Sequence, residues 1–266
     1  MYDSFNREIN YLRISVTDRC NLRCRYCMPP EGIALLDHRD ILSYDEIMEV
    51  VHAGVGLGIK KVRVTGGEPL VRRGLASLIR MIAGVEGISD LSMTTNGQLL
   101  ELYAGELKEA GLQRVNISLD TLDPDHYREL TRGGNLDDTL RGIRAAIQAG
   151  LHPVKLNCVI RQSASEPDAA QVGAFAREHG LEVRFIHRMD LETGYFRPVE
   201  GGEGGHCHIC NRLRLTSNGL VKPCLFSDIG YSVRELGAIE ALKRAIFNKP
   251  NCGDFSTNHQ FYNIGG

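Results

Sequence analysis

From residue 12 to about residue 188 the sequence repeats one pattern, in which a short run rich in Val and Ile is followed by a loop and a helical stretch that ends at glycine. Such short apolar runs are typical of strands buried in a parallel sheet. The expected strands are Leu12–Val16, Lys61–Thr65, Asp90–Thr95, Arg114–Leu119, Val154–Ile160 and Glu182–His187. Right-handed crossovers place the intervening helices outside the sheet. Since eight such units close a barrel, these six predict an α/β fold, a partial (βα)6 TIM-like barrel with a wide mouth.

Local signals mark the ends of the expected helices. Residues 43 to 46 read Ser-Tyr-Asp-Glu, a capping box, and the helix that it opens is expected to end near Gly58. Asp123 followed by Pro124 is typical of an N-cap with proline at the first helical position. Helix C-terminal stops are expected at Gly111, Gly150 and Gly180.

The regular pattern fails after residue 188. The stretch from Gly194 to Gly205 is glycine-rich, which favours a flexible connection. We therefore predict two parts, a barrel over residues 1–190 and a small C-terminal region over residues 191–266 that covers its open side. One helical stretch is expected in that region, near Val233–Asn248.

The composition limits the partners and the location of the protein. The 31 Lys and Arg residues nearly balance 33 Asp and Glu residues, and the net charge of −2 argues against binding to nucleic acids or membrane surfaces. No apolar run approaches a membrane span, and the first residues do not form a signal peptide, so we expect a cytoplasmic protein. In such a chain, eight cysteines favour metal ligands over disulfides.

A trio of cysteines, Cys20, Cys24 and Cys27, directly follows the first expected strand. A tight loop with this spacing can direct three thiolates at three corners of a cubane iron–sulfur cluster and leave the fourth iron open for reaction. A structural zinc site is the alternative, but it requires four ligands, and the nearest histidine, His38, lies far along the chain. Chemistry in barrels of this kind lies at the carboxyl ends of the strands, where this loop is expected.

The Cys-x3-Cys-x2-Cys spacing, with the aromatic Tyr26 before the last cysteine, resembles the signature of radical S-adenosylmethionine (SAM) enzymes. In that superfamily the amino and carboxylate groups of SAM bind the open iron of a [4Fe-4S] cluster. One electron from the cluster releases a 5′-deoxyadenosyl radical, which removes a hydrogen atom from the substrate. The resemblance therefore implies an enzyme with a cluster and SAM as cofactors.

The segment Thr65-Gly66-Gly67-Glu68-Pro69 follows the second expected strand. Its glycines allow a ligand to approach the backbone closely, and Glu68 can hold an ammonium group. By itself the segment indicates only a turn, but in this place it resembles the superfamily's element for the methionine part of SAM. With that resemblance, the residues expected to bind the cofactor are Tyr26, Gly66, Gly67, Glu68, Ser118 and Met189.

A second trio of cysteines lies near the C-terminus, at Cys207, Cys210 and Cys224. A zinc ribbon is a serious alternative here, because Cys252 could supply a fourth thiolate. The flanking residues 210–215 and 223–226 resemble the auxiliary-cluster segment of the GTP 3′,8-cyclases of molybdenum cofactor biosynthesis. In that family the second [4Fe-4S] cluster also keeps an open iron, which binds the purine of the substrate.

Basic residues in or beside the expected strands would be costly to bury without partners, and together they could line a cavity for a triphosphate. Some of them could instead point into solvent from the strand ends. By resemblance, the positions that bind the nucleotide are Arg13, Arg63, Lys155, Arg212 and Arg214, with Lys61, Thr94 and Arg184 as further candidates. The terminal Gly265-Gly266 resembles the family's di-glycine tail, which reaches into the active site and is assigned a catalytic role, although alone it would be typical of a disordered end.

The resemblance implies a radical SAM lyase that converts GTP to (8S)-3′,8-cyclo-7,8-dihydroguanosine 5′-triphosphate. It also implies a reducing partner such as a flavodoxin and a downstream cyclic pyranopterin monophosphate synthase, while homodimer formation is left open. Two features depart from the family: the linker from Asp190 to His206 is shorter by several dozen residues, and His187 stands where Glu is usual.

These departures leave two alternatives open. The first is a related two-cluster radical SAM enzyme that acts on another nucleotide or on a peptide. The second is a zinc-stapled binding module without catalysis. Cys158 is expected to be a small buried apolar residue, and Cys252 has no assigned role.

Overall fold

The structure, a computed structural model, describes residues 1–257, so the predicted catalytic residues Gly265 and Gly266 lie outside the described part of the chain. Its centre is a sheet with the strand order β6-β5-β4-β3-β2-β1-β7-β8-β9. The parallel strands of the predicted barrel are β1 (Tyr11–Ser15), β2 (Lys61–Thr65), β3 (Asp90–Thr95), β4 (Arg114–Ser118), β5 (Lys155–Ile160) and β6 (Glu182–His187). The predicted strands and the partial barrel are therefore confirmed, with strand ends that differ by about one residue at most.

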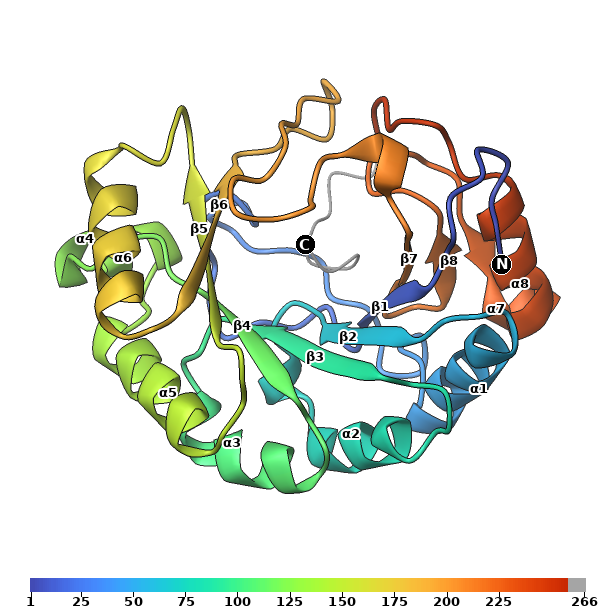
Figure 1. Ribbon diagram of the computed structural model, residues 1–266, viewed down its shortest axis with the longest axis horizontal. Helices are drawn as coiled ribbons and strands as arrows, with labels where there is room; N and C mark the ends of the chain where they lie inside the picture. Colours follow the sequence, from blue (N-terminus) through green and yellow to red (C-terminus); the bar gives the residue numbers. More distant parts are fainter. Residues whose placement is uncertain (258–266) are drawn as a thin grey trace.

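Helices cover the outside of the curved sheet (Figure 1). They are α1 (Tyr44–Gly56), α2 (Leu75–Ala83), α3 (Leu100–Glu109), α4 (Pro124–Thr131), α5 (Leu136–Gln148) and α6 (Pro167–Glu178), and a short 3-10 helix, η1, spans Pro69–Val71. The predicted capping box is confirmed, since Glu46 N donates to Ser43 Oγ at 3.2 Å and Ser43 N donates to Glu46 Oε2 at 2.7 Å. Asp123 caps α4 as predicted. No helix within residues 1–257 is both long and apolar enough to cross a membrane.

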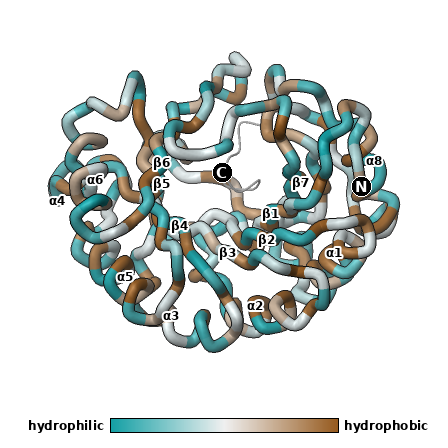
Figure 2. The backbone as a smooth tube through the Cα atoms, in the orientation of Figure 1, coloured by the Kyte–Doolittle hydropathy of each residue, from teal (hydrophilic) through white to brown (hydrophobic). Residues whose placement is uncertain are grey.

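Alternation along the strands gives the sheet two different faces. Leu12 and Ile14 of β1 are fully buried in the main core, together with side chains of α1 and α2. In Figure 2, hydrophobic and hydrophilic residues alternate along these helices, as expected for helices that turn one face to the sheet. Arg13 points to the other face, and in register beside it lie Arg63 of β2 and Arg214 of β7. The inner face of the barrel is therefore polar and basic.

The C-terminal region continues the same sheet beyond β1. It contains β7 (Arg212–Leu215), β8 (Leu220–Lys222) and β9 (Tyr231–Ser232). β7 pairs with β1 in parallel, β8 pairs with β7 antiparallel, and β9 pairs with β8 antiparallel. The helical stretch predicted near Val233–Asn248 is confirmed in place, but it is not continuous, because Gly237, at φ 77°, separates α7 (Val233–Leu236) from α8 (Ala238–Phe247). The division of the chain at residue 190 stays a prediction.

The glycine-rich linker is folded back on β6 instead of forming a free connection. Phe185 and Glu200 exchange two backbone hydrogen bonds of 3.0 Å, and Asp190 N donates to the carbonyl oxygen of Tyr195 at 2.9 Å. Gly201, at φ 79°, lies so close to β6 that a Cβ there would be 2.6 Å from the carbonyl oxygen of Val183. The linker therefore pairs with the outer edge of the last parallel strand.

Candidate active site

The first cysteine trio lies in the loop after β1 and lines a cavity of about 200 Å³ at the carboxyl ends of the strands. The end of α4 holds this loop, since the amides of Arg23 and Arg25 donate to carbonyl oxygens of residues 131 and 130 at 3.1 and 3.0 Å. Arg132 returns the contact by donating to the carbonyl oxygens of Arg23 at 2.9 Å and Met28 at 2.7 Å. The trio is thus fixed from a distant part of the sequence.

The two glycines after β2 permit a close contact with the segment that leads into the trio. Gly67 N donates to the carbonyl oxygen of Thr17, and Glu68 N donates to that of Arg19, both at 2.8 Å. A Cβ at Gly66 would lie 2.8 Å from the oxygen of Thr17, and one at Gly67 would overlap the carbonyl of Arg19. Only glycine permits this approach, which fixes the cysteine loop against β2.

Glu68 lines the same cavity but already has partners within the protein. Its carboxylate accepts hydrogen bonds from Thr95 Oγ1 at 2.8 Å and from the amides of Asn96 and Leu70 at 2.7 and 3.0 Å. Burial raises the pKa of this carboxyl group to about 7. Glu68 therefore ties the end of β2 to the end of β3, in addition to facing the cavity where an ammonium group was predicted.

Tyr26 fixes the trio from the opposite side of the cavity. Its hydroxyl donates to Asp120 Oδ2 at 2.8 Å, while Asp120 Oδ1 accepts from Val159 N at 2.8 Å. Burial raises the pKa of both Tyr26 and Asp120. The other residues predicted to bind the cofactor, Ser118 and Met189, also line this cavity.

The thiols of the first trio need a compensating positive charge to ionise. Burial raises the pKa of Cys20 to about 11 and that of Cys24 to about 12, and it also raises the pKa of Cys27 well above its ordinary value. Within residues 1–257 no three Cys, His, Asp or Glu side chains are placed to chelate a single metal ion. A cubane places each cysteine on a different iron and neutralises the thiolates, so this donor set fits a cubane.

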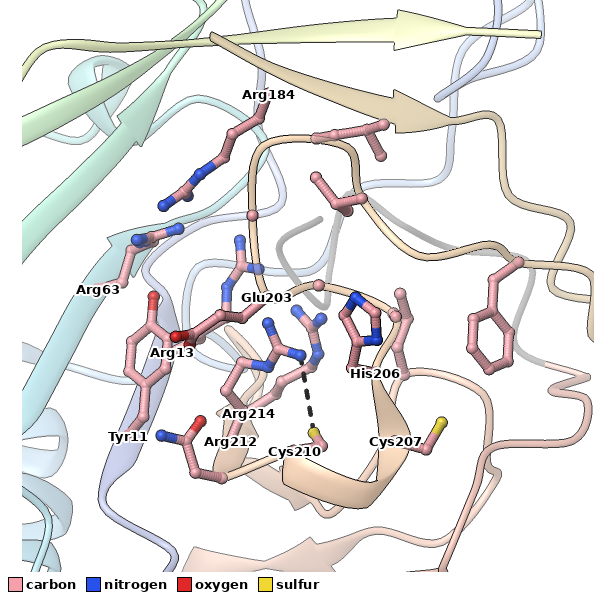
Figure 3. Close-up of a pocket in the computed structure, with 18 of the residues that line it drawn as sticks. Tyr11, Arg13, Arg63, Arg184, Glu203, His206, Cys207, Cys210, Arg212 and Arg214 are labelled. Carbon is pink, nitrogen blue, oxygen red and sulfur yellow. Dashed lines mark hydrogen bonds between the residues drawn. The ribbon is translucent and has the colours of Figure 1, made fainter. Parts of the chain in front are cut away.

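A larger cavity of about 520 Å³ adjoins the first and reaches the second cysteine trio. Asn157, Ile186 and Met189 line both cavities. Figure 3 shows the guanidinium groups of the larger cavity directed toward a common space, beside Cys207 and Cys210. The two trios therefore line adjoining cavities on the inner side of the barrel.

The buried guanidinium groups of this cavity are held close together. Burial lowers the pKa of Arg63 and Arg214 to about 10 and also lowers that of Arg13, and neighbouring arginines add to the effect. Arg184 contributes a guanidinium from β6, and its Nε is buried without a hydrogen-bond partner within residues 1–257. A polyanion would relieve the repulsion among these groups and use their paired N–H donors.

Further buried polar atoms face the two cavities without hydrogen-bond partners in the described part of the chain. They are Tyr11 Oη and Asn157 Oδ1 beside the larger cavity and Thr65 Oγ1 and His187 Nδ1 beside the smaller one, with Asn157 lining both. An unsatisfied buried polar atom costs roughly 1–3 kcal/mol. Their location in the cavity walls fits bound polar ligands that complete these hydrogen bonds.

The second trio has one cysteine prepared as a thiolate. Burial alone would raise the pKa of Cys210, but the charges of Lys249 and Arg212 and the hydrogen bonds from Arg212 lower it to about 6. One of these bonds runs from Arg212 Nη2 to Cys210 Sγ at 3.8 Å (Figure 3). Cys252 lies beside this trio, with its Sγ 2.6 Å from Cys207 Sγ. The four sulfur atoms do not converge on a common zinc position within residues 1–257.

Not all predicted residues face the cavity assigned to them. Lys155 lines neither cavity, and its ammonium pairs with Glu182 of β6. Thr94 lines the smaller cavity instead of the larger one, whereas Lys61 lines the larger one as expected. His187 is buried, with Nε2 3.3 Å from Glu200 Oε1 of the linker. The roles of these residues stay predictions.

Several cavity residues were not predicted from the sequence. These are Tyr11, Asp90, Asn96, Arg114, Asn157, Arg197 and Glu203. Most of the missed residues that lie on strands are an even number of positions from a predicted residue, as Tyr11 is from Arg13, and therefore point to the same face of the sheet. This alternation could have indicated them. Arg197 and Glu203 lie on the linker, whose path the sequence does not define.

Comparisons with known proteins agree with this arrangement. Residues 14–168 match the radical SAM superfamily. The chain is 43% identical to a GTP 3′,8-cyclase of Alkaliphilus oremlandii over 316 residues, which covers 100% of this chain and 98% of that protein. It is 39% identical to a GTP 3′,8-cyclase of Geobacter sulfurreducens, with coverage of 100% and 99%. Since these alignments are longer than the 266 residues of this chain, the relatives contain residues that have no counterpart here.

Solved structures with lower sequence identity share the fold. Streptococcus suis SuiB bound to S-adenosylmethionine matches with a TM-score of 0.65 at 17% identity, over 86% of this chain and 64% of that chain. The structure of anSMEcpe with bound AdoMet matches with a TM-score of 0.61 at 15% identity, over 91% and 81% of the two chains.

Proposed function

Because the chain belongs to the radical SAM superfamily and, within it, to the GTP 3′,8-cyclase family, we propose that it is an enzyme that converts GTP to (8S)-3′,8-cyclo-7,8-dihydroguanosine 5′-triphosphate for molybdenum cofactor biosynthesis. Its cofactors are SAM and [4Fe-4S] clusters held by the two cysteine trios. When bound by Cys20, Cys24 and Cys27, the first cluster would supply, together with SAM, the radical chemistry needed for hydrogen abstraction at C3′ of GTP.

One observation carries the proposal: the second cysteine trio lines an arginine-rich cavity that adjoins the cavity of the first trio. Arg13, Arg63 and Arg214 lie side by side on neighbouring strands, so their guanidinium groups can bind the oxygens of one triphosphate together. A nucleotide held there by its phosphates would extend between the two trios. This arrangement supports one cofactor site and one substrate site in adjoining cavities.

The residues of the smaller cavity have the task of positioning. Cys20, Cys24 and Cys27 would hold the first cluster, and the close packing of Gly66 and Gly67 on the preceding segment fixes their loop. Positioning of this kind matters because hydrogen transfer requires the reacting atoms to be nearly in contact. The buried partners of Glu68 and Tyr26 restrict movement of the loop.

The residues of the larger cavity bind and orient the substrate. Cys207, Cys210 and Cys224 would hold the second cluster near the base, while the arginines hold the phosphates. The linker from residue 190 to residue 206 forms one wall and excludes water from that side. Glu200 of this linker contacts His187, so the short linker and the unusual histidine form one local feature.

The proposal extends to partners and location. A protein such as a flavodoxin would supply the electron that this chemistry needs, a cyclic pyranopterin monophosphate synthase would take the product, and the enzyme would work in the cytoplasm. The balanced charge of the chain supports small-molecule chemistry over nucleic-acid binding.

The test is production of 5′-deoxyadenosine by anaerobic, reduced protein with SAM. We expect GTP to stimulate this production, Cys24→Ser to abolish it, and Cys224→Ser to remove the dependence on GTP while SAM still binds. If ATP, another nucleotide or a peptide stimulated the reaction and GTP did not, the chain would be a two-cluster relative with a different substrate. Colourless protein that contains zinc and no sulfide would refute the enzyme altogether.

A further inference from the structure

Two of the eight cysteines, Cys158 and Cys252, belong to neither trio. Cys158 is fully buried in the main core, as predicted for a small apolar residue. Cys252 is exposed, and its Sγ lies 2.6 Å from Sγ of Cys207 in the second trio. The two free thiols are thus in direct contact, and only a small movement separates them from the roughly 2.05 Å of a disulfide bond.

Arg7 fastens together the two segments that carry this pair. Its buried guanidinium donates to the carbonyl oxygen of Cys207 at 2.7 Å and to that of Asn251, directly before Cys252, at 2.9 Å. The carboxylate of Asp3 fixes the guanidinium in turn, at 2.6 Å from its Nε. The proximity of the two thiols is therefore a built feature of the N-terminal segment, which reaches across to the C-terminal region.

A second set of contacts holds the Cys252 segment against the trio. Lys249 is buried, and its ammonium donates to the carbonyl oxygens of Arg212 at 2.8 Å and Pro223 at 2.5 Å. On the other side of Cys252, Asp254 N donates to the carbonyl oxygen of Phe226 at 3.1 Å. The segment is thus anchored before and after the cysteine, and Cys252 cannot move far from Cys207.

This geometry distinguishes two roles for Cys252. Cysteines that bind different irons of a cubane are separated by the cluster, so sulfur atoms in contact cannot both be such ligands without rearrangement. Sulfur atoms in contact are, however, placed for thiol–disulfide exchange. Cys252 is also exposed, so an oxidant can reach it.

We propose that Cys207 and Cys252 form a reversible disulfide that withdraws Cys207 from the second trio. A small-molecule disulfide such as oxidised glutathione serves as the oxidant. The Cys252 thiolate attacks it and releases one glutathione thiol, and the Cys207 thiolate then displaces the second. Two cysteine thiols lose two protons and two electrons, one sulfur–sulfur bond forms, and the glutathione disulfide is reduced to two thiols.

The disulfide would leave Cys210 and Cys224 alone at the second site, too few to hold a cubane with one open iron. The first trio lines the other cavity and keeps its ligands. Oxidation would therefore stop substrate binding at the second cluster before the first cluster site is lost. This consequence rests on the proposed function, whereas the disulfide itself does not.

The test uses the full chain, stripped of metal by a chelator under anaerobic, reducing conditions and freed of reductant. After treatment with a stoichiometric amount of oxidised glutathione, free thiols are alkylated and the peptides are mapped by mass spectrometry. In the wild type we expect a pair of peptides linked through Cys207 and Cys252. The control Cys210→Ser should give the same linked pair, whereas in Cys252→Ser the thiol of Cys207 should be alkylated.

Iron content gives the second readout. Reconstituted wild type that is freed of sulfide and then treated with oxidised glutathione should lose about half of its iron, while Cys252→Ser treated in the same way should keep it. A linkage that omits Cys252, or an equal loss of iron in Cys252→Ser, would overturn the proposal. So would a lower iron content in Cys252→Ser that was never oxidised, because Cys252 would then be a ligand. The disulfide is detected without GTP or SAM. The disulfide test can therefore fail while GTP-dependent activity is observed, and GTP-dependent activity can be absent while the disulfide forms.

Discussion

The substitution Gly67→Ala tests whether the contact between the β2 loop and the cysteine loop positions the first trio. The added methyl group would overlap the carbonyl of Arg19 and lie 2.8 Å from the carbonyl oxygen of Asp18. These atoms belong to the backbone of Asp18 and Arg19, the two residues before Cys20, so the overlap cannot be relieved by a rotation of a side chain. The cysteine loop has to move away from β2.

The expected cost follows from what this movement breaks. The two hydrogen bonds between these loops, each 2.8 Å long, contribute about 1 kcal/mol each. Overpacking in a closely fitted site costs about 1–3 kcal/mol. We therefore expect Gly67→Ala to lower the free energy of unfolding of the cluster-free chain by about 3–5 kcal/mol and to reduce iron uptake at the first site.

The measurements are anaerobic urea unfolding, iron content after reconstitution, and SAM cleavage. Gly105→Ala is the matched control, because Gly105 lies exposed within α3, a methyl group there would meet no atom within 4 Å, and alanine should stabilise the helix by about 0.5–1 kcal/mol. If Gly67→Ala unfolded like Gly105→Ala and held as much iron as the wild type, the positioning role of the glycine contact would be refuted.

Two further predictions concern charge. Burial raises the pKa of Glu68 from 4.5 to about 7, so the folded chain holds this proton more tightly than the unfolded chain. The protonated carboxyl group therefore contributes about 3 kcal/mol to the free energy of unfolding. This contribution is fully present below pH 4.5 and is lost as the pH rises through about 7. Thermal unfolding of cluster-free protein, measured as a function of pH, should show this loss of stability. Glu68→Gln should flatten the dependence of stability on pH between pH 5 and pH 8. If the slope of that dependence were unchanged in Glu68→Gln, the raised pKa would not belong to Glu68. Arg212→Ala should weaken GTP binding roughly ten- to a hundredfold by calorimetry, since it removes a charge-assisted hydrogen bond. Lys155→Ala should leave GTP binding unchanged, because Lys155 pairs with Glu182. Equal effects of the two substitutions would contradict this account of the cavity.

The sequence predicts the barrel well because each strand carries its own local signal. The run Lys61–Thr65 is short and β-branched, and the helix before it is capped by Ser43 and Glu46, so both boundaries are encoded within a few residues. β7 was missed although Arg212 to Leu215 alternates as a strand should, because its partner, β1, lies about 200 residues away in sequence. Long-range pairing of this kind is not visible in local periodicity.

In the candidate site, too, features encoded locally could be predicted and features that depend on long-range contacts could not. Arg13 and Arg63 could be predicted from charge within apolar strands and Arg214 only from the resemblance, and the structure brings the three together on one face. The same reasoning does not anticipate the partner of Lys155, because Glu182 lies opposite it only once β5 and β6 are in register. The contact between Cys252 and Cys207 was likewise hidden, since it depends on contacts from Arg7 at the other end of the chain.

Transfer of a labelled hydrogen atom tests the central claim most directly. The account holds that the two cysteine trios line adjoining cavities, so that a radical generated at the first reaches a nucleotide held at the second. Anaerobic, reduced enzyme supplied with SAM and with GTP deuterated at C3′ should therefore yield deuterated 5′-deoxyadenosine by mass spectrometry. Formation of unlabelled 5′-deoxyadenosine at the same rate with and without GTP would contradict the account.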